Sequence, residues 1–490
     1  MGVFQKIKTF TSNLTYMPMQ LAKYSILAYL IALVAVSVLY SSQILPFWLW
    51  VFGISSILLF FAGGNYLTKQ WHNLSSATFC KRLLLYSFLI RLVYVIFIYN
   101  FNWLHYGTYY ESSVGDIEFY VPSARMLADQ FASGSWLEAI QVWLGWNVEL
   151  SDMGYIIYLA VVYLVTGGFS EVILPLILKA IYGAITCLLA YRVAQRHFGE
   201  QVGRMAGIFC MLQFTLIWWC GSMMKETEMI LLTMLFVNLT DNVLSKDNFE
   251  FKDLIGAMIL GLLLYTFRAA LTLVGFAALF VALLLADKKT INISKKISVG
   301  VVVALVFIAA YTSGLSDFMQ DASTAISDTS SQQANMEWRT ERVHGNQFAK
   351  YAGATVFVPL IFTLPFPSMA YTFLGQEHIM MQSGGYFVKN VLSFFVILVL
   401  VTLLFNGKWR KHVFPIAMIC GYMVALAFSN FAQSGRFHMP IIPLFMIFAA
   451  YGMSYYNNRS VAKWYHAALA LEIVICIAWT WFKLAGRGLA

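Results

Sequence analysis

Two carboxylates, Asp116 and Glu118, stand at the centre of the longest polar interruption in an otherwise apolar sequence. They lie in the motif Gly115-Asp116-Ile117-Glu118-Phe119-Tyr120, just before a helix-like run that ends near Phe131. The whole stretch 102–153 is rich in acids, and Arg125 is its only strongly basic residue. Acids at the start of a helix can simply stabilise its dipole. The helix dipole does not explain so many acids in one stretch. We therefore predict a catalytic or metal-binding role for Asp116 and Glu118. Asp116 is suited to act as a general base.

Two further segments add charges that could join such a site. Asp152 ends the acidic stretch, where it could instead be a solvated residue or a helix cap. Lys225 and Glu226 stand where an apolar segment begins, a place where charges are costly and are usually functional. Lys225 could alternatively extend its amine to the membrane surface. Glu226 is either a partner that holds Lys225 or, together with Asp152, a candidate ligand for a divalent metal ion, the one cofactor that we consider.

Two arginines stand at the ends of apolar runs. Arg268 interrupts 255–285, which has no other charge, and Arg436 precedes His438 in the motif Gly435-Arg436-Phe437-His438-Met439-Pro440. A guanidinium binds phosphate through paired hydrogen bonds, although it can also serve as a membrane anchor. We predict that Arg268, Arg436, His438 and Lys225 bind a phosphate group. Lys179 and Glu472 are further charges in apolar runs and have no assigned role, although Lys179 could pair with an acid of the site.

The composition requires a membrane environment for these residues. Hydrophobic residues make up 60% of the 490 and charged residues only 11%, far below the share in soluble domains. The net charge of +9 comes from Lys and Arg in short loops, which membrane topology explains better than nucleic-acid binding does. The six cysteines form no CxxC pair, so neither a zinc site nor a disulfide framework is indicated.

The spacing of apolar runs predicts an all-α polytopic membrane protein with about thirteen transmembrane helices, each needing about 20 residues. The predicted spans are 20–40, 46–66, 82–102, 171–192, 203–220, 225–243, 253–268, 270–286, 294–313, 386–406, 412–430, 438–456 and 463–483.

Loop charges predict the orientation of these spans. Every second loop is basic and is therefore cytoplasmic, so the loops 102–170, 221–224 and 314–385 face outward. This alternation requires that Tyr155 to Val165 form an interfacial or re-entrant helix that does not cross the membrane.

The chain reads as one integral membrane domain, 1–490, whose parts follow the predicted spans. These parts are an N-terminal helical hairpin (20–66), a module that contains the acidic outer loop 102–170 (82–313), an outer loop with an interfacial helix (314–385) and the C-terminal helices (386–490).

These motifs, in this order and on one side of the membrane, resemble the GT-C superfamily of polytopic glycosyltransferases. The nearest likeness is to its branch of protein O-mannosyltransferases and lipid A aminoarabinose transferases. The segment from Asp116 to Ala128 is similar to that group's catalytic loop, and the run from Arg436 to Pro443 is similar to its late arginine-and-proline motif. Two departures are that Ile117 separates the two acids and that the hairpin 20–66 precedes the family's first helix.

The resemblance implies an inverting transfer of a sugar from a polyprenyl-phosphate donor to a glycan, lipid or protein acceptor. The active site would face outward from a bacterial inner membrane. An O-antigen-type polymerase or ligase remains the alternative enzyme. A lipid or sugar transporter is the alternative from another class, and it would place charges through the depth of the membrane and not at one face.

Overall fold

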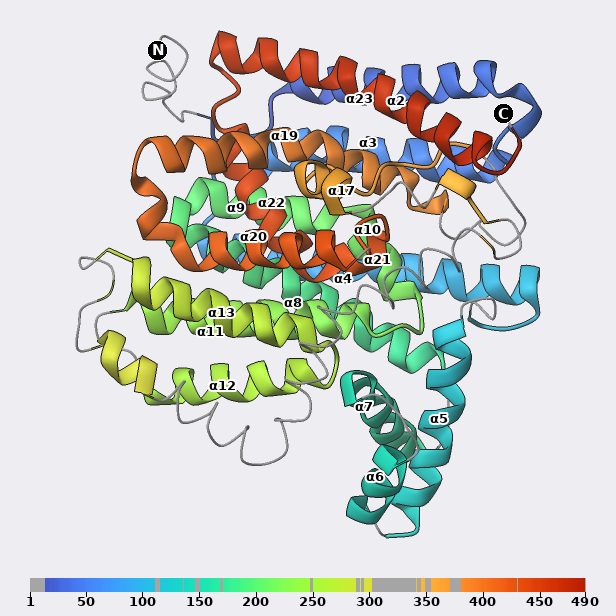
Figure 1. Ribbon diagram of the computed structural model, residues 1–490, viewed down its shortest axis with the longest axis vertical. Coiled ribbons are helices and arrows are strands. Elements are labelled where there is room, and N and C mark those ends of the chain that lie inside the picture. The colour runs from blue at the N-terminus through green and yellow to red at the C-terminus, as the bar shows by residue number, and fades with distance from the viewer. Residues whose placement is uncertain are drawn as a thin grey trace.

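The computed structural model describes residues 14–110, 115–134, 136–145, 150–167, 171–246, 250–287, 291, 295–301, 341, 345–348, 354–370, 380–429 and 431–489. Within these ranges all regular secondary structure is helical and no strand occurs. The helices of the main bundle run roughly parallel or antiparallel to one another (Figure 1). The prediction of an all-α fold is therefore confirmed.

Nine segments in the described part of the chain are long and apolar enough to cross a membrane, and they make this an integral membrane protein. They comprise α2 (Met19–Leu39), α3 (Phe47–Trp71), α4 (Ser76–Tyr106), α8 (Ile173–Phe198), α11 (Glu226–Ser245), α19 (Ser383–Phe405), α20 (Val413–Phe428) with the preceding 3-10 turn η5 (Lys408–His412), α22 (Ile442–Met453) with the preceding turns α21 (Gly435–His438) and η6 (Met439–Ile441), and α23 (Arg459–Ala485).

The remaining predicted spans take other forms. Segment 203–220 corresponds to α9 (Glu200–Leu212) and α10 (Phe214–Trp218), which belong to a pair of segments bent by 54° at the break between them. Segments 253–268 and 270–286 form α12 (Phe251–Tyr265) and α13 (Ala269–Leu285), which are shorter than a full span. Most of 294–313 lies outside the described residues. The count of thirteen therefore stays a prediction.

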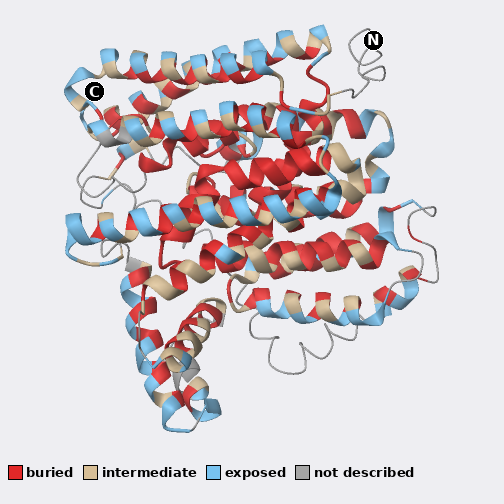
Figure 2. Cartoon of the chain, turned by 180° about the vertical axis from the view of Figure 1, so that it is seen from behind, coloured by how far each residue is buried: buried red, intermediate tan, exposed pale blue. Residues whose placement is uncertain are grey.

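The centre of the bundle consists of helices that are apolar on all sides. Every residue of α22 except Tyr451 is buried, and so is α9 from Val202 onward. A helix that is hydrophobic all round must lie inside a large protein or in lipid, and here protein surrounds it. Figure 2 shows this buried centre and the exposed outer faces of the peripheral helices. Large apolar side chains on those outer faces, such as Leu27, Val93 and Trp464, are suited to contact lipid.

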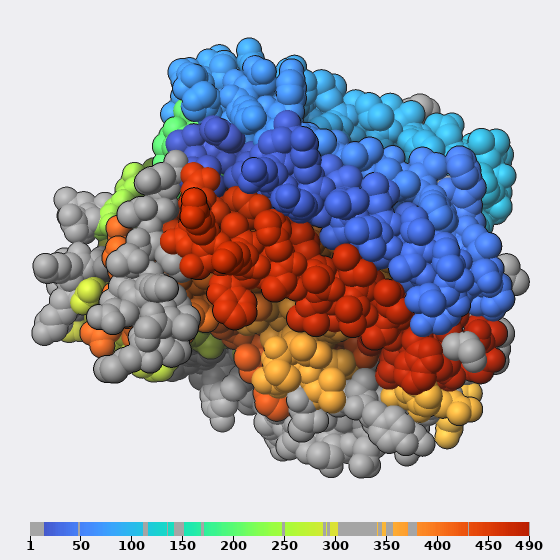
Figure 3. All heavy atoms as spheres, turned by 90° about the horizontal axis from the view of Figure 1, so that it is seen from above, coloured from blue at the N-terminus to red at the C-terminus, as the bar shows by residue number. Residues whose placement is uncertain are grey.

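The N-terminal hairpin packs onto the C-terminal helices. Helix α2 lies against α23 and α3, and α3 lies against α19. The hydroxyl groups of Ser25 and Tyr465, from α2 and α23, are 2.5 Å apart in a buried hydrogen bond. Figure 3, seen from the side of these helices, shows α2 and α23 as neighbouring parts of one surface. The hairpin is thus a peripheral layer of the bundle, far from the acidic stretch in Figure 1.

The acidic stretch folds into a small helical lobe beside the bundle. It consists of α5 (Gly115–Ala132), α6 (Trp136–Gly145) and α7 (Leu150–Thr166), and α5 packs on α7. Helix α5 lies across the direction of the bundle helices (Figure 1). Helix α7 contains the run 155–165 and is 17 residues long, which is short for a bilayer span. Its interfacial location stays a prediction.

Labelling of single cysteines tests the topology that follows from this arrangement. In a variant whose partly exposed Cys80 and Cys420 are replaced by serine, we expect Ser133→Cys and Asn457→Cys to react with a membrane-impermeant maleimide from opposite faces. Ser133 is exposed between α5 and α6, and Asn457 is exposed between α22 and α23 at the far end of the bundle. Reaction of both from the same face of sealed vesicles would contradict this topology.

Candidate functional site

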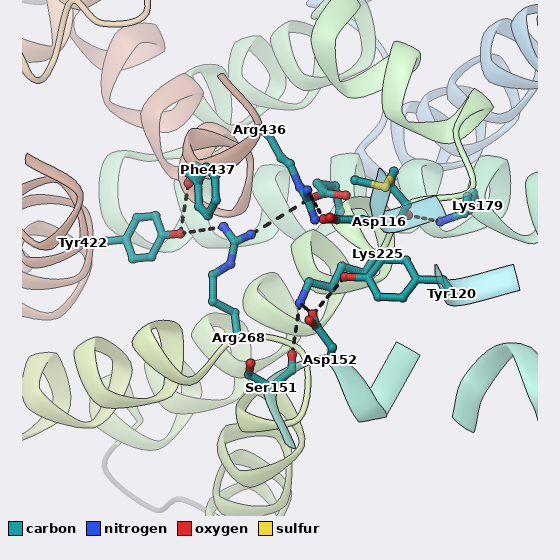
Figure 4. A network of polar contacts seen from close by, with 12 residues as sticks. Asp116, Tyr120, Ser151, Asp152, Lys179, Lys225, Arg268, Tyr422, Arg436 and Phe437 are labelled. Carbon is teal, nitrogen blue, oxygen red and sulfur yellow. Dashed lines mark hydrogen bonds and ion pairs between the residues drawn. The ribbon is translucent and has the colours of Figure 1, made fainter. Parts of the chain in front are cut away.

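Six of the charged residues singled out in the sequence lie in one region where five segments meet (Figure 4). They are three carboxylates, Asp116, Asp152 and Glu226, and three cations, Lys225, Arg268 and Arg436. The set comes from α5, α7, the start of α11, the turn before α13, and α21. We call these six residues the charge network.

Arg436 is the centre of the charge network. Its guanidinium donates from Nη1 to Asp116 Oδ2 and from Nε to Glu226 Oε1. Glu226 is fully buried, whereas the side chain of Asp116 is 47% exposed. A buried carboxylate needs a cation and hydrogen bonds, because burial alone would penalise its charge strongly. Arg436 therefore ties the buried start of α11 to the lobe helix α5.

The backbone that presents Arg436 requires a residue without a side chain at position 435. A Cβ at Gly435 would lie 2.1 Å from the hydroxyl oxygen of Tyr386 on α19. Glycine lets α21 approach α19 this closely and so fixes where the next residue, Arg436, projects. A glycine has a similar role in α7, where a Cβ at Gly154 would lie 2.2 Å from Thr266 Oγ1. The Gly154 amide donates to the Thr266 carbonyl at 3.0 Å, which joins the lobe to the turn that carries Arg268.

Arg268 has the weakest contact with a carboxylate in the charge network. Its Nη2 is 4.0 Å from Glu226 Oε1, and its Nη1 donates to the Tyr422 hydroxyl at 3.3 Å. Its guanidinium carbon lies 4.3 Å from the ring centroid of Phe437, which is a cation–π contact. The Tyr422 hydroxyl in turn donates to the Phe437 carbonyl at 3.0 Å. Two aromatic residues thus orient a guanidinium whose hydrogen-bonding capacity is only partly used.

Lys225 and Asp152 form an ion pair of the charge network that involves neither arginine. Lys225 Nζ contacts Asp152 Oδ1 and donates to the Ser151 carbonyl at 3.0 Å. The Tyr120 hydroxyl donates to the same Asp152 oxygen at 2.9 Å. Burial lowers the pKa of Lys225 from its usual value, and the nearby Asp152 opposes this shift. Burial and the Asp152 charge raise the pKa of Tyr120, so this phenol is a hydrogen-bond donor at neutral pH.

A further ion pair lies beside the charge network. Sequence reasoning anticipated that Lys179 could pair with an acid of the site but did not identify Glu228 as that acid. Lys179 Nζ on α8 donates to Glu228 Oε2 and to the Met224 carbonyl, both at 2.6 Å, and lies 4.9 Å from the ring centroid of Tyr155. Both residues of the pair are buried. The sequence feature that indicates an acidic partner for Lys179 is the presence of two acids, Glu226 and Glu228, in the first turn of an apolar helix.

Two predicted site residues lie outside the charge network. Glu118 is exposed on α5, because positions two apart on a helix point to nearly opposite faces and Asp116 occupies the face toward Arg436. His438 is buried and donates from Nε2 to the Ala432 carbonyl at 2.7 Å, which occupies that nitrogen within the protein. The structure therefore brings Asp116, Asp152, Lys225, Glu226, Arg268 and Arg436 together, but not Glu118 or His438.

The predicted metal ligands, Glu226 and Asp152, each contact a cation of the protein, Arg436 and Lys225 respectively. In the described part of the chain, no group of three His, Cys, Asp or Glu side chains is arranged to hold a metal ion. Both carboxylates are ion-paired in this arrangement, and their role as metal ligands stays a prediction.

Comparison of the chain with known proteins gives no relative: no family model, no curated protein and no solved structure matches it. Its class therefore rests on the fold and on the charge network. The protein is an all-helical polytopic membrane protein with a cluster of paired charges where a lateral helical lobe meets the bundle.

Replacement of Arg436 by alanine should destabilise the protein. We expect a loss of about 3–5 kcal/mol in the free energy of unfolding, because Glu226 would lose its hydrogen-bonded cation and keep only the 4.0 Å contact with Arg268. The double variant Glu226→Ala/Arg436→Ala should lose less than the sum of the two single variants. Denaturant titration in detergent micelles, followed by circular dichroism, measures this difference.

Arg459→Ala is the matched control, because Arg459 is an exposed arginine at the far end of the bundle. Its effect should stay within about 0.5 kcal/mol. Equal effects of Arg436→Ala and Arg459→Ala would show that the charge network does not hold these segments together.

Proposed function

We propose that this protein is a glycosyltransferase that moves a sugar from a polyprenyl-phosphate donor to an acceptor hydroxyl on the extracytoplasmic side of the membrane. The observation that carries the proposal is the convergence of Asp116, Arg268 and Arg436 on one site. Such a transfer needs a base for the acceptor and cations for the departing phosphate. The likeness of the two sequence motifs to GT-C enzymes supports the same conclusion.

Asp116 is the proposed general base. It has the most exposed side chain of the three carboxylates, so an acceptor hydroxyl can reach it, whereas Glu226 is fully buried. In the proposed step Asp116 takes the proton of the acceptor hydroxyl, and the acceptor oxygen forms a bond to the anomeric carbon. The bond from this carbon to the phosphate oxygen breaks on the opposite side. One displacement of this kind inverts the anomeric centre.

Arg268 is the proposed primary contact of the donor phosphate. Arg436 already contacts two carboxylates, whereas Arg268 has only a 4.0 Å contact with one. A phosphate that loses its sugar gains negative charge, so cations there stabilise the transition state more than the bound donor. A phosphate that also contacts Arg436 would compete with Asp116 for this guanidinium. Donor binding would then release Asp116 to act as the base.

Buried polar atoms near the charge network are suited to a sugar. Glu226 Oε2, Glu228 Oε1, the Tyr155 hydroxyl and Ser222 Oγ are buried and make no hydrogen bond within the described part of the protein. Buried polar groups usually have partners, and the hydroxyl groups of a sugar can both donate and accept. They come from α7, from the segment before α11 and from the first turn of α11, the same elements that carry Asp152, Lys225 and Glu226.

An O-antigen-type polymerase or ligase would also use a polyprenyl-linked glycan, and it remains the alternative enzyme. A transporter would need charges along a path through the bilayer. The convergence of the six charged residues where the lobe meets the bundle favours a transferase.

Asp116→Asn tests the role of the proposed base. Transfer of radiolabelled sugar from a panel of polyprenyl-phosphate sugars should fall about 100- to 10,000-fold, because the amide keeps the shape but cannot take a proton. Binding of the donor should be retained. Glu118→Gln, on the exposed face of the same helix, is the matched control and should transfer at the wild-type rate. Normal turnover by purified Asp116→Asn would remove Asp116 from the mechanism.

Arg268→Ala tests the phosphate contact. We expect donor affinity to fall about tenfold or more, since a charged hydrogen bond contributes roughly 1.5–3 kcal/mol. Arg268→Lys should restore little of it, because an ammonium cannot make the paired contacts of a guanidinium. Arg125→Ala, which removes an exposed arginine paired with Glu171 in the lobe region, should bind donor normally. Unchanged donor binding by folded Arg268→Ala would place the phosphate elsewhere.

A further inference from the structure

A second polar cluster lies at the opposite end of the bundle, at the end of α8. Lys179, near the start of α8, and Arg196, near its end, are separated along the helix axis by roughly 26 Å. Arg196 donates from Nε to Asp241 Oδ2 at 2.5 Å and from Nη1 to Asn238 Oδ1 at 3.1 Å. The cluster therefore joins α8 to α11 far from the charge network.

Histidines extend this cluster to the turn before α20. His197 Nε2 is 2.8 Å from Asp241 Oδ1, and its Nδ1 is 2.9 Å from Nδ1 of His412. The His412 ring stacks on Phe198, with 4.7 Å between the ring centroids. Asp241 is thus already paired with Arg196 and His197, so the carboxylate at the centre of this cluster has little capacity for another cation.

The turn η5 adds three cations to the same place. Lys408, Arg410 and Lys411 are exposed, and none of them forms an ion pair with a carboxylate in the described part of the chain. Arg410 lies over the ring of Trp409, at 5.6 Å from its centroid. Two carboxylates also line the cavities described below, Asp241 in the smaller and Asp287 in the larger. Together with Arg196, the three cations of η5 outnumber these two carboxylates, so the region is positively charged.

Two adjoining cavities open between these groups. One has a volume of about 350 Å³ and the other of about 730 Å³, and Arg196, His197 and Lys411 line both. Arg410 lines the smaller cavity and Lys408 the larger. The smaller cavity also has an apolar wall from the ends of α11, α13 and α20. A concave site lined by cations and by apolar groups of low dielectric constant strengthens the electric field that acts on a bound anion.

We propose that this pair of cavities is a binding site for a phosphate group, held by Lys408, Arg410 and Lys411 beside the Arg196–Asp241 ion pair. Each cavity is lined by two cations of η5 that form no ion pair in the described part of the chain, Arg410 and Lys411 in the smaller and Lys408 and Lys411 in the larger. Such cations match the charge and the acceptor oxygens of phosphate. The apolar wall of the smaller cavity offers contact to the chains of an anionic lipid, while the larger cavity admits a free phosphate compound. The site lies at the other end of the bundle and is independent of the proposed transfer reaction.

The tendency of loops at one membrane face to be basic does not by itself account for this arrangement. The loop between α22 and α23 lies at the same end of the bundle, since Tyr451 near its start stacks on Phe198 at 4.3 Å between ring centroids. The exposed cations Arg459 and Lys463, at the start of α23 just after this loop, line neither cavity. The turn η5 and the start of α23 are both positively charged, but only the cations of η5 line a cavity. This difference supplies a matched control.

The test uses the full-length protein in nanodiscs of phosphatidylcholine. Radiolabelled pyrophosphate is the soluble probe, measured by equilibrium dialysis. Phosphatidylglycerol added to the nanodiscs is the lipid probe, and native mass spectrometry counts the lipid molecules that stay bound after release. The wild-type protein should bind at least one of the two probes, and the probe that binds identifies the source of the phosphate. Lys408→Gln/Lys411→Gln should weaken that binding about tenfold or more.

The control variant is Arg459→Gln/Lys463→Gln, which removes the same number of charges at the same end of the bundle and should bind as the wild type does. Arg410→Gln/Lys411→Gln is a second test variant in case the first is poorly folded, as judged by size-exclusion chromatography. Binding of neither probe by the wild-type protein would overturn the proposal. An equal loss in the test and control variants would also overturn it, since it would show only a general effect of charge.

Discussion

The structure depends on how the buried carboxylate of Glu226 is neutralised. It lies at the start of an apolar helix with no exposed surface, where an unpaired charge would cost several kcal/mol. Arg436, 210 residues later in the chain, provides the cation and also contacts Asp116. One guanidinium therefore determines how α11, α21 and the lobe helix α5 meet. The glycine at position 435 is a consequence, because α21 must approach α19 closely to present this arginine.

Buried ion pairs are an inefficient way to stabilise a protein, since apolar residues of the same volume often serve as well or better. The protein nevertheless places three cations and three carboxylates in one small region and a further pair, Lys179 and Glu228, beside it. This concentration is understandable if the charges act on a substrate. In the proposed reaction a negatively charged lipid phosphate enters, gains charge as the sugar leaves, and needs cations that are already oriented. Arg268, held between Phe437 and Tyr422, meets this requirement.

The sequence allowed the membrane class, the helical fold and six members of the site to be predicted, because each rests on local properties. Charges at the ends of apolar runs are visible without a structure, and so Lys225, Glu226, Arg268 and Arg436 could be selected. The partners were not predictable in the same way. Asp116 and Arg436 are separated by 320 residues, and their contact depends on the rotation and tilt of several helices. The pairing of Lys179 with Glu228 depends on the packing of α8 against α11 in the same way.

Two predicted site residues, Glu118 and His438, lie outside the charge network, each for a specific physical reason. Glu118 follows Asp116 by two residues on α5, so the helical period directs it away from Arg436. His438 belongs to a short turn, and the direction of its side chain cannot be predicted from a helical period. Its ring donates a hydrogen bond to the Ala432 carbonyl.

The predicted spans 253–268 and 270–286 form helices of 15 and 17 residues. A hydropathy pattern gives the length of an apolar segment but not the residues at which a helix begins and ends.

The central claim is that the charge network binds a lipid-linked phosphate through its arginines and releases Asp116 in doing so. A cryo-electron microscopy structure of the wild-type protein in nanodiscs with bound polyprenyl phosphate tests this claim most directly. The account predicts a phosphate within about 3 Å of the Arg268 guanidinium, with Asp116 no longer paired with Arg436. A polyprenyl phosphate bound away from both arginines, with the Asp116–Arg436 ion pair intact, would contradict it.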